Sequence, residues 1–509
     1  MSDWSSGYVS DIDYTFGYYN ELNPLRIKVA LAYQGFAAPE ISKACELGFG
    51  QGLSLNINAA GSGISWTGND FNPQQAAFAK ELSGKYDSDI FVTDDSFEEL
   101  LSRDDLPDFD FICLHGIWSW ISDDNRQLIV ELIKKKLKLG GVVYVSYNTL
   151  PGWSSFAPMR HLLSLHAEQL GAEGDGIVSR IDGSIAFANQ LLESEPQYLK
   201  VNPTVQERLK LLEGQNKHYL AHEFFNLDWH PMHYATMLNW LSEAKLQFAC
   251  SAHLLDHIDV LNLTKEQQEL LNGIKDKNFK ESTRDFLTNQ QFRRDYWVKG
   301  LRKITSIERA DIFLKLRVVL TLKRDDVKLV AKGSLGEAKL GENVYSPILD
   351  TMADNKPISL ERITTELPQL SFEQIVQAIT VMIGTGHLNI CHSEEEASSN
   401  WQKARDLNIE LCKKSRSSGD ITFLCSPVTG GGVSVTRFQQ LFLLAEFEGM
   451  FEFEDKVSFV WQVLSRQGQK LIKDGKTLES AEENLTELRN LLSAFIDDRR
   501  SILNSLGIV

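Results

Sequence analysis

Three glycines at alternate positions, Gly48, Gly50 and Gly52, follow the acidic residue Glu46. Glycine adopts backbone conformations that other residues avoid, and it lets a ligand approach bare N–H groups. The run 53–60 is compatible with a helix whose positive end would point at the same loop. This spacing predicts a loop for a nucleotide-type cofactor after a first β-strand, with an ordinary glycine-rich turn as the alternative.

Polar residues also follow the next strands that the sequence predicts. Asp70 ends a second strand, Asp95 and Ser96 follow a third, and His115 follows a fourth. Because parallel strands end at one crevice, we expect Asp70 to hold the two ribose hydroxyls, and Asp95 and Ser96 to contact the adenine edge. The candidate cofactor residues are Glu46, Gly48, Phe49, Gly50, Gly52, Asp70, Phe71, Asp95, Ser96 and His115.

A second group of chemically capable residues follows the fifth predicted strand, 142–147. Asn148 offers a carbonyl oxygen that could orient an amine, and Trp153 could shield the reacting atoms from water. Tyr147, Asn148 and Trp153 are therefore candidate catalytic residues. The alternative is a simple turn before the next helix, because Pro151 is followed directly by glycine.

Four further residues are candidates for contacting a substrate. Tyr14 belongs to an aromatic cluster that either folds over the cofactor or packs against the sheet edge. Trp118 either lines a substrate channel, fills the core or forms a dimer contact. His222 and Glu223 lie on a predicted helix, with His218 one turn earlier. We expect no metal there, because no third ligand follows at a suitable spacing.

The elements that would position these residues alternate between strand and helix. Such alternation predicts an α/β fold with a doubly wound, mostly parallel sheet. The predicted strands are 44–47, 64–70, 91–93, 109–114 and 142–147, and the predicted helices are 73–86, 97–101 and 123–138.

The combined pattern resembles the class I S-adenosylmethionine-dependent methyltransferases, whose sheet is Rossmann-like. The third glycine comes one residue earlier than in the Gly-x-Gly-x-x-Gly loop of dinucleotide-binding proteins. Phe49 departs from the small residue or cysteine that is usual at its position. The resemblance implies that S-adenosyl-L-methionine is the cofactor and that its methyl group is transferred directly, by in-line displacement.

Longer stretches are similar to bacterial methyltransferases that carry a methyltransferase regulatory domain. They are 115–120, 146–153, 219–226, and Asp285 with 289–293. That family includes protein-lysine methyltransferases, so the resemblance implies a protein lysine amine as acceptor. It also implies that His222 and Glu223 belong to the regulatory domain and face the active site. Two alternatives stay open: a small-molecule N- or O-methyltransferase, and a non-catalytic protein that senses the cofactor.

The whole chain limits the classes of partner and location. Its 509 residues carry a formal net charge of −17, which argues against a nucleic-acid binder and suits a protein partner with a basic segment. The six cysteines are scattered, which indicates reduced thiols and a cytoplasmic protein. No apolar run is long enough to span a membrane, and residues 1–13 are unlike a signal peptide. A homodimer is compatible with the sequence.

Three domains are expected along the chain. Residues 1–170 would form the methyltransferase domain, 171–335 a helical middle domain for regulation or substrate, and 336–509 a C-terminal domain with a winged-helix-like α+β part at 342–393. Further expected features are a helical pattern over 154–271, a hairpin of 314–322 with 327–332, an exposed linker at 394–399, a glycine-rich loop at 429–432, and helices over 437–506.

Overall fold

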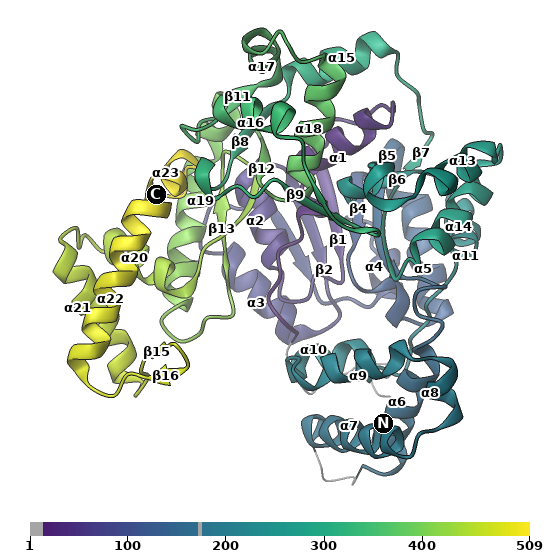
Figure 1. Ribbon diagram of the computed structural model, residues 1–509, viewed down its shortest axis with the longest axis horizontal. Helices are drawn as coiled ribbons and strands as arrows, with labels where there is room; N and C mark the ends of the chain where they lie inside the picture. The colour runs from purple at the N-terminus through teal and green to yellow at the C-terminus, as the bar shows by residue number, and fades with distance from the viewer. Residues whose placement is uncertain (1–13, 172–175) are drawn as a thin grey trace.

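A seven-stranded sheet forms the centre of the computed structural model, which describes residues 14–171 and 176–509 (Figure 1). The expectation for residues 1–13 lies outside these described residues. The strand order is β3-β2-β1-β4-β5-β7-β6, and β7 alone runs opposite to the other six strands. The strands are β1 (Lys43–Leu47), β2 (Ser65–Asn69), β3 (Ile90–Thr93), β4 (Phe109–Leu114), β5 (Leu137–Asn148), β6 (Leu246–Ser251) and β7 (Phe292–Lys299).

The five strands predicted from the sequence are confirmed, together with the helices between them. Strand β5 begins earlier than predicted, because Gly140 adopts a φ of +82° inside it and the register with β4 shifts there. Helix α1 begins after Asn23, whose side chain accepts a hydrogen bond from the backbone of Leu25. The helices are α1 (Pro24–Tyr33), α2 (Leu53–Ser62), α3 (Pro73–Ser83), α4 (Phe97–Ser102) and α5 (Asp123–Lys136).

Strands β6 and β7 were not predicted, and they extend the sheet beyond residue 170. Strand β7 carries Arg293, Arg294 and Asp295, of which Arg293 and Asp295 are buried. These charged residues interrupt the apolar pattern by which a buried strand is predicted. In the folded protein each of them forms an ion pair. The domain boundaries at 170 and 335 stay a prediction, but the sheet takes two of its strands from between them.

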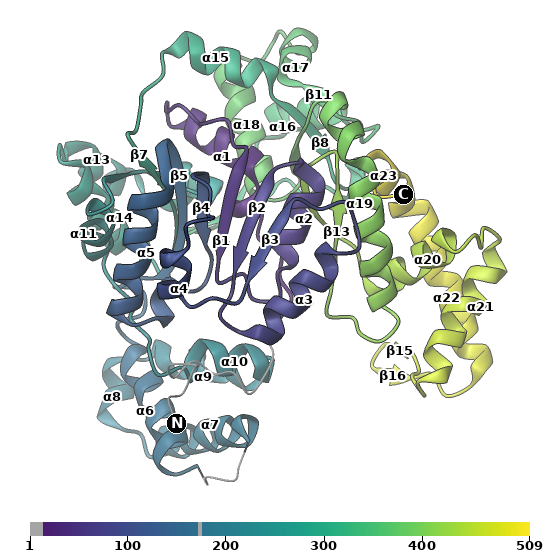
Figure 2. The same ribbon diagram turned by 180° about the vertical axis from the view of Figure 1, so that it is seen from behind.

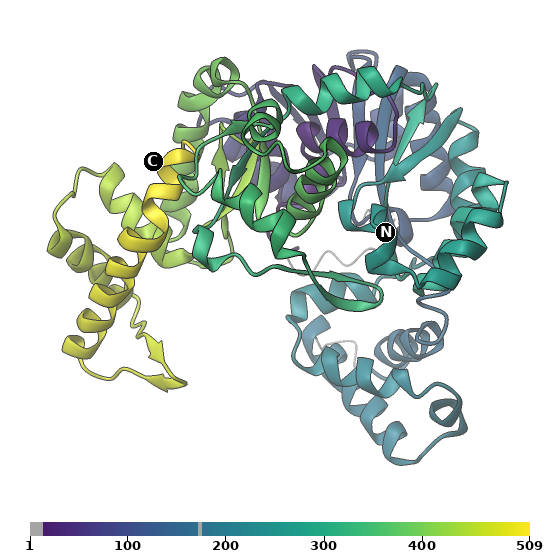
Figure 3. The same ribbon diagram turned by 45° about the horizontal axis from the view of Figure 1, so that its top comes forward.

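A group of helices projects from one end of the sheet (Figures 1 and 3). Its core surrounds Trp153, Phe156 and Leu209. The helices confirm the helical pattern predicted up to residue 244, after which β6 interrupts it. They are α6 (Ala157–Gln169), α7 (Ile177–Glu193), α8 (Gln197–Val201), α9 (Thr204–Glu213) and α10 (Lys217–Phe224). Within the range of this pattern, residues 172–175 lie outside the described residues.

The region between this group and the C-terminal part returns to the sheet and then leaves it. Helix α11 (Tyr234–Ser242) precedes β6, and α14 (Lys277–Thr288) precedes β7. Helix α15 (Ser306–Lys315) occupies residues that were partly expected to be strand. Between β6 and α14 lie the short helices α12 (Asp259–Asn262) and α13 (Lys265–Gly273).

The predicted hairpin of 314–322 with 327–332 is wrong. Strand β8 (Arg317–Leu320) instead pairs with β11 (Ile358–Ser359) and β12 (Leu388–Cys391). Its apolar residues are buried, as expected for the central strand of three. Strand β9 (Val330–Gly333) pairs with β10 (Gly336–Lys339), where Gly336 supplies a φ of +105° for the turn.

Three helices lie between these strands along the chain. They are α16 (Glu342–Asp350), α17 (Leu360–Glu366) and α18 (Phe372–Gly384). Residues 342–393 therefore contain both helices and strands, as the predicted α+β part requires. The likeness to a winged helix stays a prediction.

The stretch 394–399 is not a linker, because it opens the helix α19 (Glu394–Lys414). Ser393 and Glu396 form a capping box, a starting signal that the sequence contains.

The predicted glycine-rich loop runs into β14 (Gly431–Ser434), which pairs with β13 (Phe423–Ser426). The remaining long helices are α20 (Arg437–Phe447), α21 (Phe453–Arg466) and α22 (Ala481–Phe495), at the edge of the molecule in Figure 2. Over the described ranges, no helix is long and apolar enough to cross a membrane.

Candidate active site

The glycine loop between β1 and α2 adopts the backbone conformation that its sequence suggests. Gly48, Gly50 and Gly52 have φ values of +66°, +61° and +66°, which favour glycine. A Cβ at Gly52 would lie 2.5 Å from the Cβ of Ala79, so α3 also packs closely there. The loop is fixed to the next strand, since the backbone N–H of Gly50 donates to Oδ2 of Asp70 at 2.8 Å.

Two buried carboxyl groups lie under this loop. Burial raises the pKa of Glu46 to about 8 and that of Asp70 to about 7. Asp70 accepts backbone hydrogen bonds from Gly50 and Asn72, whereas Oε2 of Glu46 has no partner. A buried oxygen without a donor is costly, so this pocket suits a ligand that brings hydroxyl or ammonium donors.

The third strand end is less open than expected. The Asp95 carboxylate forms an ion pair with Arg103, with Nη1 and Oδ2 3.0 Å apart. The Ser96 hydroxyl belongs to the capping box of α4, with Glu99. Both residues stay next to β2, because Nδ2 of Asn69 donates to the backbone oxygen of Asp95. Their side chains already have partners within the protein, and the predicted adenine contact stays a prediction.

His115 lies in the same pocket as Glu46 and the glycine loop. Its Nδ1 forms a 2.8 Å hydrogen bond with the Tyr144 hydroxyl, and its ring stacks on Tyr19 with centroids 3.6 Å apart. Burial lowers the pKa of His115 to about 4, so the ring is neutral at pH 7.

The N-terminal aromatic residues divide between two surroundings. Tyr14 lies over the loop, where a Cβ at Gly50 would be 3.2 Å from its ring. Tyr18 turns the other way and packs against Gly432 of the C-terminal part. Phe49 lies between loop and sheet and lines the pocket. Only about 20 Å³ remains free under Tyr14, so Tyr14 fills most of the space over the loop.

Asn148 and Glu223 come together although they lie on different elements. The backbone of Asn148 is fixed, since its N–H donates to Oγ of Ser119 at 2.8 Å and its oxygen accepts from Met232 at 3.0 Å. Its Nδ2 is buried and has no hydrogen-bond partner. Burial raises the pKa of Glu223 on α10 to about 7, while the neighbouring Asn148 amide favours the charged form.

Two other candidate residues join this group. The rings of Tyr14 and His222 meet edge to face with centroids 5.1 Å apart. The Tyr14 ring thus lies between the glycine loop and α10. The structure therefore brings Tyr14, Asn148, His222 and Glu223 together at the end of the sheet where the loop lies.

Three candidate residues point elsewhere. The Tyr147 hydroxyl donates to Oδ2 of Asp295 at 3.0 Å, on the opposite face of β5 from Asn148. Trp153 is buried in the core of the projecting helices, with the Arg208 guanidinium 3.6 Å from its ring centroid. Trp118 is fully buried and packs edge to face on Trp240, which favours the core alternative. Phe71 is only partly buried, directly after Asp70.

Sequence reasoning did not select Tyr19, Tyr219 or Arg208. Tyr19 stacks on His115, while Tyr219 and Arg208 lie close enough to Glu223 to affect its surroundings electrostatically. Tyr219 precedes Glu223 by one helical turn, so the shared helix face was the available signal. Arg208 carried no such signal, because it lies on α9.

Two stretches that carried the family resemblance are in contact. Thr149 and Gly152 donate backbone hydrogen bonds to the backbone oxygens of Gln291 and Gln290, at 2.9 and 3.0 Å. The hydroxyl of Thr149 also donates to the backbone oxygen of Gln290, at 2.7 Å. The turn after β5 is therefore built on the start of β7, which fixes Asn148 in place.

Comparisons with known proteins agree with this arrangement. Residues 216–299 match a family model described as a predicted methyltransferase regulatory domain. An uncharacterized protein of Synechocystis, sll1526, is 39% identical over 512 residues and covers 99% of both chains. An uncharacterized protein of Rickettsia prowazekii, RP789, is 24% identical over 93% of this chain and 89% of its own length.

The fold is that of a solved methyltransferase structure. PKMT2 from Rickettsia typhi, in complex with AdoHcy, superposes with a TM-score of 0.71 and 19% identity, over 97% of this chain and 99% of the other. The strand order, the glycine loop and the regulatory-domain match point the same way. The chain belongs to one family with sll1526, contains a match to the predicted methyltransferase regulatory domain at 216–299, and has the fold of PKMT2.

Proposed function

We propose that this protein transfers a methyl group from S-adenosyl-L-methionine to a lysine amine of a protein, by direct in-line displacement. The observation that carries the proposal is the contact between Glu223 and Asn148 beside the glycine loop. A half-buried carboxyl that can accept N–H donors, next to the buried Asn148 amide with its carbonyl oxygen, suits an incoming amine. The resemblance to a family that includes protein-lysine methyltransferases supports the choice of acceptor.

Residues around the loop would hold the cofactor, which supplies an already activated methyl group when bound. The positive-φ glycines leave their N–H groups bare, and Glu46 keeps one oxygen without a partner. Asp70 lies where the ribose hydroxyls of a nucleoside would meet the sheet end. Neutral His115 and the ring of Tyr19 form an uncharged wall of the pocket beside the glycine loop.

Asn148 and Glu223 would prepare the acceptor. A lysine side chain arrives as an ammonium ion, with a pKa of about 10.4 in water, and only its neutral form has a free electron pair. Glu223, whose pKa is about 7, is partly ionised at neutral pH and in that form would take the proton from the ammonium nitrogen. The Asn148 carbonyl oxygen would accept a hydrogen bond from a remaining N–H and so aim the electron pair.

The acceptor protein would present its lysine on a basic segment. The chain has a net charge of −17, so long-range attraction favours such a segment. A homodimer and a cytoplasmic location remain predictions.

The proposal is tested by incubating the full-length protein and methyl-labelled cofactor with a bacterial extract, then separating protein from small molecules. Label in the protein fraction is the expected result. Label only in small molecules would contradict the lysine acceptor and favour a small-molecule methyltransferase. Label in neither fraction would favour a protein that senses the cofactor.

A further inference from the structure

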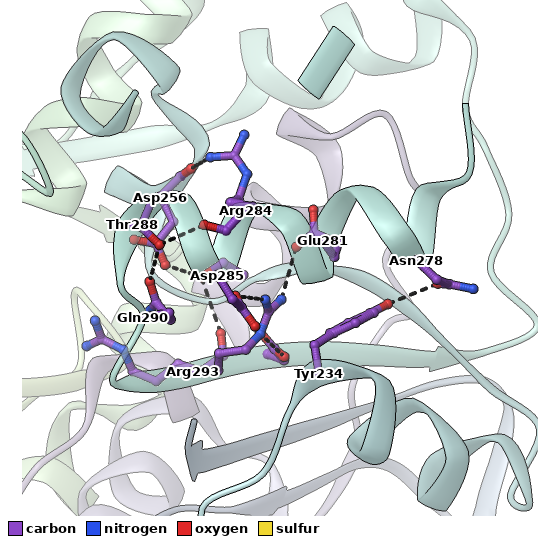
Figure 4. A network of polar contacts seen from close by, with 12 residues as sticks. Tyr234, Asp256, Asn278, Glu281, Arg284, Asp285, Thr288, Gln290 and Arg293 are labelled. Carbon is purple, nitrogen blue, oxygen red and sulfur yellow. Dashed lines mark hydrogen bonds and ion pairs between the residues drawn. The ribbon is translucent and has the colours of Figure 1, made fainter. Parts of the chain in front are cut away.

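A cluster of charged side chains is buried where β7 pairs with β5. At its centre is Arg293, whose Nε lies 2.8 Å from Oδ2 of Asp295 on the same strand. Its Nη1 and Nη2 reach Asp285 and Glu281 of α14, at 2.6 and 3.1 Å (Figure 4). These four residues, which we call the Arg293 cluster, therefore join α14 to β7.

Strand β5 contacts the Arg293 cluster through Tyr147. The register places Tyr147 directly opposite Arg293, so the two side chains lie on the same face of the sheet. The Tyr147 hydroxyl donates to Oδ2 of Asp295 at 3.0 Å, and the same oxygen accepts from Nε of Arg293. Asn148 comes next along β5 and points to the opposite face. The cluster thus holds β5 one residue before Asn148.

The turn at the end of β5 is linked to the same cluster. The backbone oxygen of Asp285 accepts a hydrogen bond from the backbone N–H of Gln290, at 2.9 Å. The backbone oxygen of Gln290 in turn accepts the hydrogen bonds of Thr149 and Gly152. Asp285 therefore holds Arg293 with its side chain, and it holds the support of the turn with its backbone.

Stability alone does not account for charges at this depth. Tyr147, Asp285, Arg293 and Asp295 are all more than nine-tenths buried. Removing charges from water is costly, and well-packed apolar side chains of the same volume are often equally stable. Such a cluster can instead specify one arrangement, because a slip of β7 by one residue would turn Arg293 and Asp295 to the other face. The cluster therefore specifies how β7 is aligned with β5.

We propose that Tyr147 and Arg293 are positioning residues, which fix the end of β5 so that Asn148 faces the acceptor amine. This role depends on the function proposed above, in which Asn148 orients the amine. Neither residue lines the pocket of the glycine loop, so both act through the backbone of β5 and the turn that follows it. The stretches 146–153 and 289–293 thereby form one unit, although they lie far apart in the chain.

The variant Tyr147→Phe tests this role with a small change, because it removes only the hydroxyl that reaches Asp295. The measurement is the single-turnover rate of label transfer from the cofactor to proteins of a bacterial extract. We expect this rate to fall roughly tenfold, since a displaced acceptor reacts more slowly. The affinity for S-adenosylhomocysteine should stay within about twofold of the wild type, because Tyr147 lies outside the cofactor pocket.

Tyr234→Phe is the matched control. The Tyr234 ring is buried and lies 4.8 Å from the guanidinium carbon of Arg293. Its hydroxyl, however, donates to Asn278 at 3.1 Å and contacts neither the Arg293 cluster nor β5 (Figure 4). This variant also loses one tyrosine hydrogen bond, so its melting temperature should fall about as much as that of Tyr147→Phe. Its rate of label transfer should be unchanged.

A second background separates positioning from a general structural effect. A residue that acts only through Asn148 has nothing left to position once that amide is removed. Adding Tyr147→Phe to Asn148→Ala should therefore change the rate by less than about twofold. Arg293→Lys keeps the positive charge but loses the planar fork that joins three carboxylates. It should lower the rate more than Tyr147→Phe does, and it should likewise have no further effect in Asn148→Ala.

Hydrogen exchange in the ligand-free protein tests the anchor without any methyl transfer. The backbone N–H of Asn148 donates to Oγ of Ser119, and it exchanges when the end of β5 opens locally. We expect this N–H to exchange at least roughly tenfold faster in Tyr147→Phe than in the wild type or in Tyr234→Phe.

Three results would overturn the positioning role. They are a normal rate in Tyr147→Phe, a loss that is additive with Asn148→Ala, and equal exchange of the Asn148 N–H in Tyr147→Phe and Tyr234→Phe. Failure of the proposed function would look different, because Asn148→Ala would itself keep a normal rate. The positioning role would then fail with it, even with faster exchange in Tyr147→Phe.

Discussion

Some residues in the candidate active site have buried polar atoms without a hydrogen-bond partner. Among the described residues, Oε2 of Glu46 and Nδ2 of Asn148 are buried and have no hydrogen-bond partner, and burial raises the pKa of Glu223, beside Asn148, to about 7. Unpartnered buried atoms are rare in proteins and call for an explanation. A cofactor with hydroxyl or ammonium donors would supply the partner that Oε2 of Glu46 lacks.

The pH dependence of turnover tests the role of Glu223. Protonation removes the electron pair that would accept the proton, so turnover should fall about tenfold per pH unit below pH 7 and level off above it. In Glu223→Gln, turnover should be lower and should keep rising toward the pKa of lysine itself, about 10.4. Single-turnover rates over this range provide the measurement.

The matched control is Glu207→Gln, which changes an exposed carboxylate on α9 and should leave the profile unaltered. An unaltered profile in Glu223→Gln would remove this residue from the mechanism.

Asn148 should affect the transition state more than the binding of cofactor. We expect Asn148→Ala to reduce turnover by roughly 100-fold, which corresponds to about 3 kcal/mol. S-adenosylhomocysteine affinity should stay within about twofold of the wild type, because the amide faces Glu223 and not the glycine loop. Calorimetry and single-turnover rates on the same variant separate the two effects. A normal turnover number would show that the acceptor is aimed by other groups.

At the scale of elements, the turn after β5 is held by β7. Gly152 lies so close to the backbone oxygen of Gln290 that a Cβ would overlap it. This contact explains why a turn carrying Asn148 requires the seventh strand, which joins the sheet much later in the chain. The position of Asn148 is thus a property of two elements together.

Gly152→Ala should therefore disturb the protein more than an ordinary glycine replacement. Overpacking at such a site costs about 1–3 kcal/mol, and it should lower both the melting temperature and turnover. Gly214→Ala is the control, since Gly214 has a helical conformation and no atom within 4 Å of its Cβ position. Equal melting temperatures for the two variants would mean that the turn is not fixed by this contact.

Whether a strand could be predicted from the sequence depended on whether its buried residues are apolar or are charged and ion-paired. Strands β1, β4 and β5 were predictable because most of their residues are apolar and buried. Strand β7 was not, because buried Arg293 and Asp295 are satisfied by ion pairs that only the fold assembles.

In the candidate site, too, the sequence indicated single residues but not the contacts between them. Asn148 and Glu223 could be selected singly, from a strand end and a motif, but their contact depends on how α10 packs. Tyr147 was misplaced because a strand shows which residues alternate and not which face meets the cofactor.

At the scale of the whole molecule, the C-terminal part completes the sheet domain. Apolar residues of α2, such as Leu53 and Ile57, share one core with Leu407 and Leu411 of α19. The backbones approach closely as well, since a Cβ at Gly61 would lie 2.9 Å from the carbonyl carbon of Gly430. Figure 2 shows α19 lying along α2.

A chain ending at residue 340 should therefore fail to fold normally. It would expose the apolar face of α2, and we expect low solubility and loss of a cooperative thermal transition. Deleting the exposed segment 472–477 is the control and should leave both intact. A soluble 1–340 chain that binds S-adenosylhomocysteine as the full chain does would contradict this account.

The identity of the methylated atom tests the central claim most directly. The full-length protein is incubated with labelled cofactor and bacterial proteins, and the labelled protein is hydrolysed to amino acids and examined by mass spectrometry. The account predicts methyl groups on the lysine side-chain nitrogen, at a level reduced roughly 100-fold in Asn148→Ala. Methyl groups on carboxylate, hydroxyl or other nitrogen atoms, or equal labelling by Asn148→Ala, would contradict it.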